Sequence, residues 1–277
     1  MKTRECIDVD SKKVSYLINR SSSQDIPVVF IHGLGSAASD YEEAFLRPVL
    51  SERIMIAPDL IGFGESDKPK DFSYDLLDQV KILDSLLEKL NYPCVDLVAH
   101  SMGGVIGILL GVQFGSRIRR LIVAEPNLVP ENAQISQRIC SYGSLEEFSK
   151  HFDTFIGKYN RPNNSSSYRF YNTLSQTTPE AIFKSACSLL EYAKGDMYKN
   201  FLQLDIPREY IKAEKSWQII SEQQLFEFSD RNIGFHVVPE AGHGMMGDNP
   251  KDFYDILEGI LESPLTLKRF DDEGMNI

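Results

Sequence analysis

The chain has 277 residues, a net charge of −11 and a hydrophobic fraction of 42%. These values suit a globular protein with a substantial core, and they exclude disordered, collagen-like and disulfide-scaffold classes. The sequence has no basic stripe, so no nucleic-acid partner is expected. It has no apolar run of the roughly 18–20 residues that a membrane span needs. Residues 1–13 lack the apolar centre of a signal peptide, so none is expected.

Four cysteines are scattered along the chain, at Cys6, Cys94, Cys140 and Cys187. None belongs to a C-x-x-C pair and none has a neighbouring histidine, so we expect free thiols rather than a metal site. This usage predicts a reducing compartment and therefore a cytoplasmic location.

The first 125 residues alternate short β-rich runs with helix-like stretches. Within residues 74–90, Leu83, Leu86, Leu87 and Leu90 recur at spacings of three and four, which predicts an amphipathic helix. A second helix is expected at 102–114, and strands are expected at 14–18, 28–31, 54–57, 94–99 and 119–124. This alternation predicts a parallel sheet with helices on both faces.

The pattern changes between residues 127 and 206, where we expect helices but no strand. The expected helices are 145–159 and 179–194, separated by a polar loop at 163–167. Strands resume at 209–213 and 235–238, a last helix is expected at 252–261, and the final thirteen residues are expected to form a loose tail.

This helical insertion carries 12 of the 29 aromatic residues and is net neutral. Such a composition suits a lid over a mostly apolar pocket, with Phe152 and Phe155 as candidates to face it. Small helical lids also need aromatic residues for their own packing, and composition does not separate the two interpretations.

The segment Ala99-His100-Ser101-Met102-Gly103-Gly104 follows an expected strand and opens an expected helix. It predicts a nucleophile elbow, a sharp turn that exposes the Ser101 hydroxyl and needs small flanking residues. The helix start at Met102 offers an N–H group and a positive dipole end to a developing oxyanion. The simpler interpretation is a serine that caps an ordinary helix.

Two further segments fit the same chemistry. A turn at residues 32–35 follows the first buried strand, and the N–H group of Leu34 could join Met102 in an oxyanion hole. His243 lies between the last expected strand and the last helix, so of the five histidines it is the one placed to act as a general base. We expect His32 to be structural.

Together these motifs resemble the α/β-hydrolase family. The matching segments are 32–35, 57–67, 99–104 and 241–250, within residues 14–262. The resemblance implies a mostly parallel sheet of eight strands with helices on both faces and a helical cap after the sixth strand. It also implies hydrolysis by a Ser-His-acid triad, and a structural role for Asp59. We expect the core to comprise residues 1–126 and 207–277, and the cap residues 127–206.

The sequence departs from the family pattern at the acid. The family usually has an aspartate after the next-to-last strand, where this chain has Ser216 in Ala213-Glu214-Lys215-Ser216. Some capped α/β-hydrolases carry the acid at the end of the strand before the cap, which is Glu125 here. We therefore assign Glu125 as the acid, with a hinge residue held by backbone donors as the alternative.

We predict a serine hydrolase that cleaves a small ester or related acyl substrate. Ser101 attacks, His243 takes its proton, Glu125 stabilises the imidazolium, and the amides of Leu34 and Met102 hold the oxyanion. No metal or organic cofactor is expected. The expected partner is a small, apolar acyl substrate, and a homodimer is left open.

Two alternatives remain open. One is carbon–carbon bond cleavage or a lyase reaction on the same residues. The other is a ligand-binding receptor with weak turnover, which Ser216 at the usual acid position favours.

Overall fold

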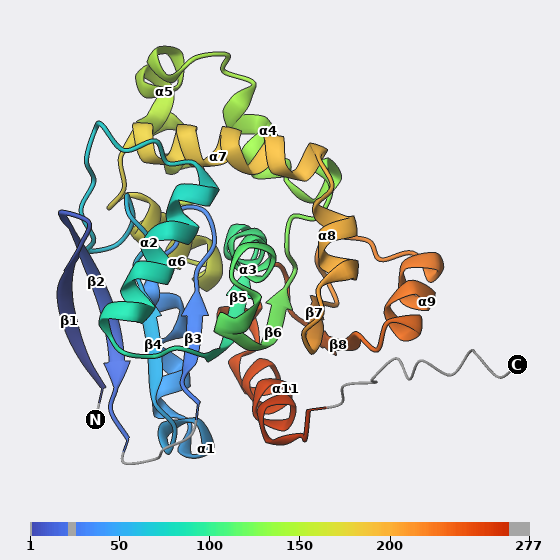
Figure 1. Ribbon diagram of the computed structural model, residues 1–277. Coiled ribbons are helices and arrows are strands. Elements are labelled where there is room, and N and C mark those ends of the chain that lie inside the picture. The colour runs from blue at the N-terminus through green and yellow to red at the C-terminus, as the bar shows by residue number, and fades with distance from the viewer. Residues whose placement is uncertain (1, 22–25, 266–277) are drawn as a thin grey trace, which may run out of the picture.

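A computed structural model describes residues 2–21 and 26–265 (Figure 1). It contains one eight-stranded sheet in the order β1-β2-β4-β3-β5-β6-β7-β8. The strands are β1 (Lys2–Val9), β2 (Lys12–Asn19), β3 (Val28–Ile31), β4 (Met55–Pro58), β5 (Val95–His100), β6 (Ile118–Ala124), β7 (Arg208–Ala213) and β8 (Gly234–Val238). β2 pairs antiparallel with β1 and β4, and the remaining pairs are parallel. The predicted fold class is confirmed.

β1 is the strand that the sequence analysis did not predict. It pairs with β2 along its whole length through a tight turn in which Asp10 and Ser11 both have positive φ. As an edge strand it is half exposed, and charged residues interrupt its apolar pattern. Its alternation was therefore too weak to mark it as a strand.

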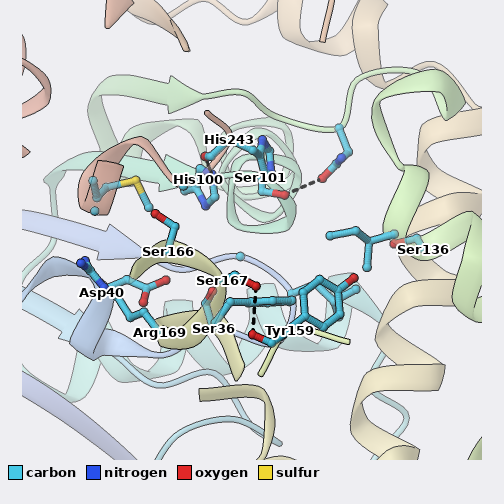
Figure 2. Close-up of a pocket in the computed structure, with 18 of the residues that line it drawn as sticks. Ser36, Asp40, His100, Ser101, Ser136, Tyr159, Ser166, Ser167, Arg169 and His243 are labelled. Carbon is cyan, nitrogen blue, oxygen red and sulfur yellow. Dashed lines mark hydrogen bonds between the residues drawn. The ribbon is translucent and has the colours of Figure 1, made fainter. Parts of the chain in front are cut away.

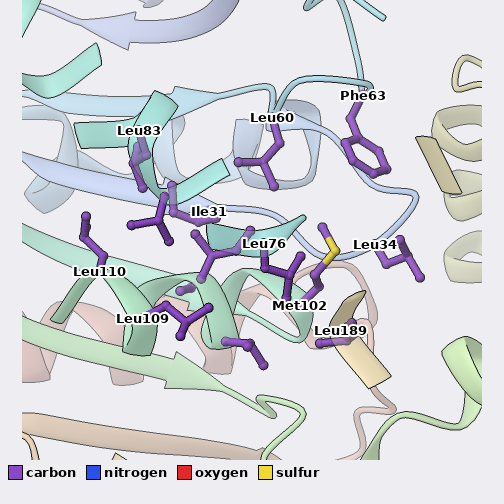
Figure 3. Packing of buried hydrophobic residues seen from close by; sticks show 14 of the residues in the cluster. Ile31, Leu34, Leu60, Phe63, Leu76, Leu83, Met102, Leu109, Leu110 and Leu189 are labelled. Atoms are coloured by element: carbon purple, nitrogen blue, oxygen red, sulfur yellow. The ribbon is translucent and has the colours of Figure 1, made fainter. Parts of the chain in front are cut away.

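Helices cover both faces of the sheet. One core cluster joins Ile31 and Leu97 to α2 (Leu76–Lys89) and α3 (Met102–Gln113), and Figure 3 shows Ile31 among these helices. A second cluster joins Phe30 and Val98 to η1 (Ala38–Leu46), α1 (Pro48–Ser51) and α11 (Pro250–Glu262). Consecutive residues of β3 and β5 face opposite layers, so both faces of these strands are buried. The nearly continuous apolar sequence of α3 follows from its burial between the sheet and the helices beyond it.

Between β6 and β7, the regular secondary structure of residues 127–206 is all helical, and we call this segment the cap. It contains η3 (Pro130–Asn132), α4 (Gln134–Cys140), α5 (Leu145–Gly157), α6 (Ser165–Leu174), α7 (Pro179–Lys194) and α8 (Met197–Gln203). In Figure 1, α4, α5 and α7 lie beyond the carboxyl ends of the parallel strands. The division of the chain into core and cap domains at residues 126 and 206 stays a prediction.

One cap prediction was wrong in detail. Residues 163–167 were expected to be a loop, but α6 begins at Ser165 and Asn164 caps it by accepting a hydrogen bond from the Ser167 amide at 2.8 Å. Asparagine and serine favour both loops and helix N-caps, so composition alone does not separate the two.

The remaining elements are η2 (Gly115–Arg117), α9 (Glu222–Asp230) and α10 (Met245–Asp248). No helix within the described residues combines the length and hydropathy that crossing a membrane requires. The four cysteines are free, and the sulfurs of Cys140 and Cys187 lie 2.7 Å apart between α4 and α7. The expected loose tail falls almost wholly outside the described residues.

Candidate active site

Ser101 occupies a sharp turn between β5 and α3. Its φ of 54° and ψ of −118° lie in a region that residues other than glycine rarely adopt. The turn needs glycine on its far side, because a Cβ atom on Gly103 would lie 2.4 Å from the Ile31 carbonyl oxygen. The tight approach of β3 to the start of α3 therefore explains the glycine at position 103.

His243 lies on the loop between β8 and α10, where three groups hold it. Its Nδ1 donates a hydrogen bond to Glu125 Oε2 at 2.6 Å, and its carbonyl oxygen accepts one from His100 Nε2 at 2.8 Å. The Trp217 ring packs against the imidazole with 4.5 Å between the ring centroids. With Nδ1 as a donor, Nε2 of the neutral ring is left as the basic nitrogen.

Glu125 follows the last residue of β6, and its carboxylate is fully buried. Oε1 accepts a hydrogen bond from the Ala213 amide at 3.0 Å, and Oε2 accepts one from the Ser216 hydroxyl at 2.7 Å in addition to that from His243. A buried carboxylate needs such donors. Ser216, at the usual position of the acid, is therefore a hydrogen-bond partner of Glu125.

The backbone of Glu125 is also constrained. Its φ of 44° is in the left-handed region, and its amide donates to the Ile211 carbonyl at 3.0 Å. Its carbonyl oxygen accepts a hydrogen bond from Gln218 Nε2 at 3.1 Å. Contacts to β7 and to the loop after it thus hold this strained residue in place.

The Ser101 hydroxyl donates to Asn127 Oδ1 at 3.1 Å, the dashed bond from Ser101 in Figure 2. Asn127 is buried, and its amide nitrogen donates to the Asn132 carbonyl at 2.7 Å. Among the described residues the hydroxyl makes no hydrogen bond to His243. A triad role for Ser101 requires its hydroxyl to exchange Asn127 for His243.

Two backbone amides lie free beside this turn. Within the described chain, neither the Leu34 amide nor the Met102 amide has a hydrogen-bond acceptor. Met102 is the first residue of α3, and the turn that carries Leu34 lies close to the serine, since a Cβ atom on Gly33 would be 3.2 Å from Ser101 Cβ. The positive end of the α3 dipole adds to the potential of these amides.

His32 and Asp59 have structural surroundings. Burial lowers the pKa of His32, whose Nε2 accepts from the Leu60 amide at 3.0 Å and whose Nδ1 donates to the Gly33 carbonyl at 2.8 Å. Asp59 is fully buried and accepts from the Ala38 amide at 2.7 Å and from Arg4 at 2.6 Å. Burial also lowers the pKa of His100, so this ring is neutral beside His243.

A cavity of about 530 Å³ opens between this site and the cap. Ser101, Asn127 and His243 line it. Its apolar lining comprises Leu34, Ala133, Ile135, Phe170, Leu189, Trp217 and Met246. Its charged lining comprises Asp40, Arg138, Lys158, Arg161, Arg169 and Asp248. Phe152 and Phe155 do not line it, because they pack with Phe148 inside the cap.

Comparison with known proteins gives the family. A family model described as the alpha/beta hydrolase fold matches residues 26–249. The chain belongs to this family. A thermophilic esterase from Thermogutta terrifontis superposes with a TM-score of 0.74 at 18% identity, covering 94% of this chain and 98% of the esterase. A mutant of the N-acyl homoserine lactonase AidH superposes with a TM-score of 0.73 at 16% identity, covering 94% of this chain and 96% of the lactonase.

Sequence relatives of this α/β hydrolase cover it to different extents. An uncharacterised protein of Mycobacterium bovis is 31% identical over 85% of this chain and 75% of its own length. Abhydrolase domain-containing protein abhd-5.2 of Caenorhabditis elegans is 27% identical over 90% of this chain and 63% of its own length. The 2-hydroxy-6-oxo-2,4-heptadienoate hydrolase of Pseudomonas putida is 35% identical over 35% of this chain and 36% of its own length. The chain thus spans less than two thirds of the length of the Caenorhabditis elegans and Pseudomonas putida relatives.

Sequence reasoning missed Asn127 and Trp217 as neighbours of the candidate triad. Asn127 had a signal, since it follows Glu125 by two residues at the same strand end. Trp217 directly follows Ser216, but nothing in the sequence shows that the loop after β7 folds over His243.

Proposed function

We propose that this α/β hydrolase cleaves a small ester or related acyl substrate, with Ser101, His243 and Glu125 as its catalytic triad. The observation that carries the proposal is the 2.6 Å hydrogen bond from His243 Nδ1 to the buried Glu125 carboxylate. It orients a basic imidazole nitrogen at the cavity that Ser101 also lines. The cap, residues 127–206, would close this cavity from above.

The reaction proceeds in two halves. Ser101 Oγ attacks the acyl carbon while His243 Nε2 takes its proton, and His243 then gives that proton to the departing alcohol oxygen. A water molecule next attacks the acyl–Ser101 ester, again with His243 as base, and releases the acid. Glu125 stays ionised and stabilises the imidazolium in both halves.

The negative charge of each tetrahedral intermediate requires donors close to the carbonyl oxygen. The unpaired amides of Leu34 and Met102 suit this role, because they border the serine and need no reorganisation when charge develops.

Carbon–carbon bond hydrolysis is the second candidate. It is favoured by the relative named 2-hydroxy-6-oxo-2,4-heptadienoate hydrolase. The same three residues would serve, so the substrates decide between the two reactions.

The test compares Ser101→Ala with Ser136→Ala, which removes another buried serine hydroxyl from the cavity wall. Each protein is assayed with p-nitrophenyl esters of rising chain length, and its mass is measured after fluorophosphonate treatment. We expect the wild type and Ser136→Ala to carry one label. Ser101→Ala should carry none and should lose on the order of 10⁴-fold in turnover. A labelled Ser101→Ala protein with near-wild-type turnover would contradict the proposal.

A further inference from the structure

Charged residues of the cap are segregated by sign. The cap contains eight basic and eight acidic residues. Four of the basic residues line the cavity, namely Arg138, Lys158, Arg161 and Arg169. Within the described part of the chain, none of the eight cap carboxylates does so. A net-neutral segment thus presents a basic inner surface, which we call the basic rim and define by these four residues.

The basic rim differs from most of the other cap cations in its ion pairing. Of the four cap cations outside the cavity lining, Lys150, Lys184 and Lys194 each form an ion pair with a cap glutamate one helical turn away. The four rim residues form no ion pair among the described residues. Their positive charge is therefore available to a ligand.

Two acidic residues, Asp40 and Asp248, also line the cavity, against the four cations of the rim. Asp248 accepts hydrogen bonds from the Gly242 amide at 2.9 Å and from the Ser166 hydroxyl. Asp40 lies beside Arg169 in Figure 2. Burial raises the pKa of Asp40 to about 6, so this carboxyl is mostly ionised at pH 7 and offsets part of the charge of the rim. Four cations against two carboxylates leave the cavity wall net positive.

We propose that the basic rim binds an anionic group, a carboxylate or a phosphate, on the substrate whose acyl carbon meets Ser101. This inference rests on the proposed function and names its substrate class. Arginine guanidinium groups suit both anions, because their N–H groups match pairs of oxygen atoms. The apolar wall near Leu34, Phe170 and Leu189 would take the hydrocarbon part. The expected apolar substrate is thus amended to an acyl substrate with a charged end.

The charge of the whole chain strengthens the argument. The chain carries a net charge of −11, so a cavity lined by four cations and two carboxylates is opposite in sign to the chain as a whole. A cleft lined by one sign of charge concentrates the field and the matching ligand within it. A cavity of about 530 Å³ has the size of a small-molecule site and can hold both parts of such a substrate.

The experiment uses pairs of esters that differ in one charged group. The carboxylate pair is p-nitrophenyl hemiglutarate and its neutral methyl ester, and the phosphate pair is 1-hexanoylglycerol 3-phosphate and 1-hexanoylglycerol. We expect kcat/KM to favour the anionic member of at least one pair by about tenfold or more. The pair that shows the preference identifies the anion. Added salt should reduce the preference.

Variants locate the effect. Arg138→Gln, Lys158→Gln, Arg161→Gln and Arg169→Gln, singly and together, should reduce kcat/KM for the anionic ester more than for its neutral partner. The combined variant should lose most of the preference. Lys150→Gln is the matched control, since it removes a cap cation that is paired with Glu146 outside the cavity. Its preference should stay at the wild-type level.

Binding to Ser101→Ala separates this inference from the proposed function. Calorimetry with hexanoate, hexyl phosphate and hexanol needs no turnover, and we expect an anion to bind more tightly than the alcohol. Ester turnover without an anionic preference would overturn the inference alone. Equal binding of all three ligands, unchanged in the combined variant, would overturn it even if no ester were hydrolysed. If fluorophosphonate did not label the wild-type protein, the result would instead contradict the proposed function.

Discussion

Ser216 and Glu125 illustrate how one side chain can take over the place of another. A carboxylate at the end of β7 is the usual acid, and here that position supplies a hydroxyl that donates to Glu125 from the end of β6. The family resemblance identified both positions from the sequence, because Glu125 directly follows β6 and Ser216 lies three residues beyond the end of β7. It did not identify their hydrogen bond, which depends on how two loops 91 residues apart pack together. The acid assignment itself stays a prediction that this geometry supports.

Asp40 provides a pH-dependent test at the residue scale. Burial raises its pKa from 3.8 to about 6, against the opposing effects of Ser36 and Arg169, while the charge of Asp59 raises it further. The folded state therefore prefers the protonated form. Its contribution to stability is complete below about pH 4 and is lost as the pH rises through about 6.

Asp40→Asn mimics the protonated form, so we expect its stability not to fall in this way as the pH rises. Urea unfolding from about pH 4 to pH 7 should show the variant gaining stability relative to the wild type, by about 3 kcal/mol at most. A stability difference that stays constant over this range would show that Asp40 is not held in its neutral form.

At the scale of elements, the predictions followed the strength of each periodic signal. β3 and α7 occur at their expected bounds, because a short buried run after Pro27 and a long helical pattern starting at Pro179 are both well delimited. β1 and α6 escaped prediction because an edge strand and an asparagine-capped helix resemble loops in composition.

The junction of β3 with α3 predicts a large effect from one methyl group. In Gly103→Ala the new Cβ atom would lie 2.4 Å from the Ile31 carbonyl oxygen and 2.7 Å from that of His32, so backbone must move. We expect a loss of roughly 1–3 kcal/mol in unfolding free energy, together with reduced ester turnover.

Gly259→Ala is the control for that substitution. A Cβ atom there meets nothing within 4 Å, and alanine favours a helix by up to about 1 kcal/mol over glycine. Denaturant unfolding should show this variant to be as stable as the wild type or more so. Equal stability of both variants would mean that β3 and α3 do not approach closely.

For the whole molecule, the sequence was sufficient to predict the family and the layered sheet, since both follow from motifs and local periodicity. The residues that line the cavity could not be predicted from the sequence. The bond from Ser101 to Asn127, the position of Trp217 over His243 and the convergence of four cap cations each join segments that are distant in sequence. The composition shows only that the cap is net neutral. It does not show that four of the cap's cations line the cavity while its carboxylates lie elsewhere in the described chain.

The central claim is that Glu125, rather than a residue at the end of β7, is the acid of the triad. The most direct measurement is kcat/KM on one p-nitrophenyl ester for the wild type, Glu125→Gln, Ser216→Ala and the double variant Glu125→Gln with Ser216→Asp. Thermal unfolding of each protein controls for folding.

Glu125→Gln should reduce kcat/KM by roughly 10³–10⁴-fold, because an amide does not stabilise the imidazolium or its required tautomer. Ser216→Ala should cost less than about tenfold, since the carboxylate keeps its charge and its hydrogen bonds from His243 and the Ala213 amide. The double variant should recover at least part of the loss by restoring a carboxylate at the end of β7. Near-wild-type kcat/KM in a folded Glu125→Gln protein would contradict the account.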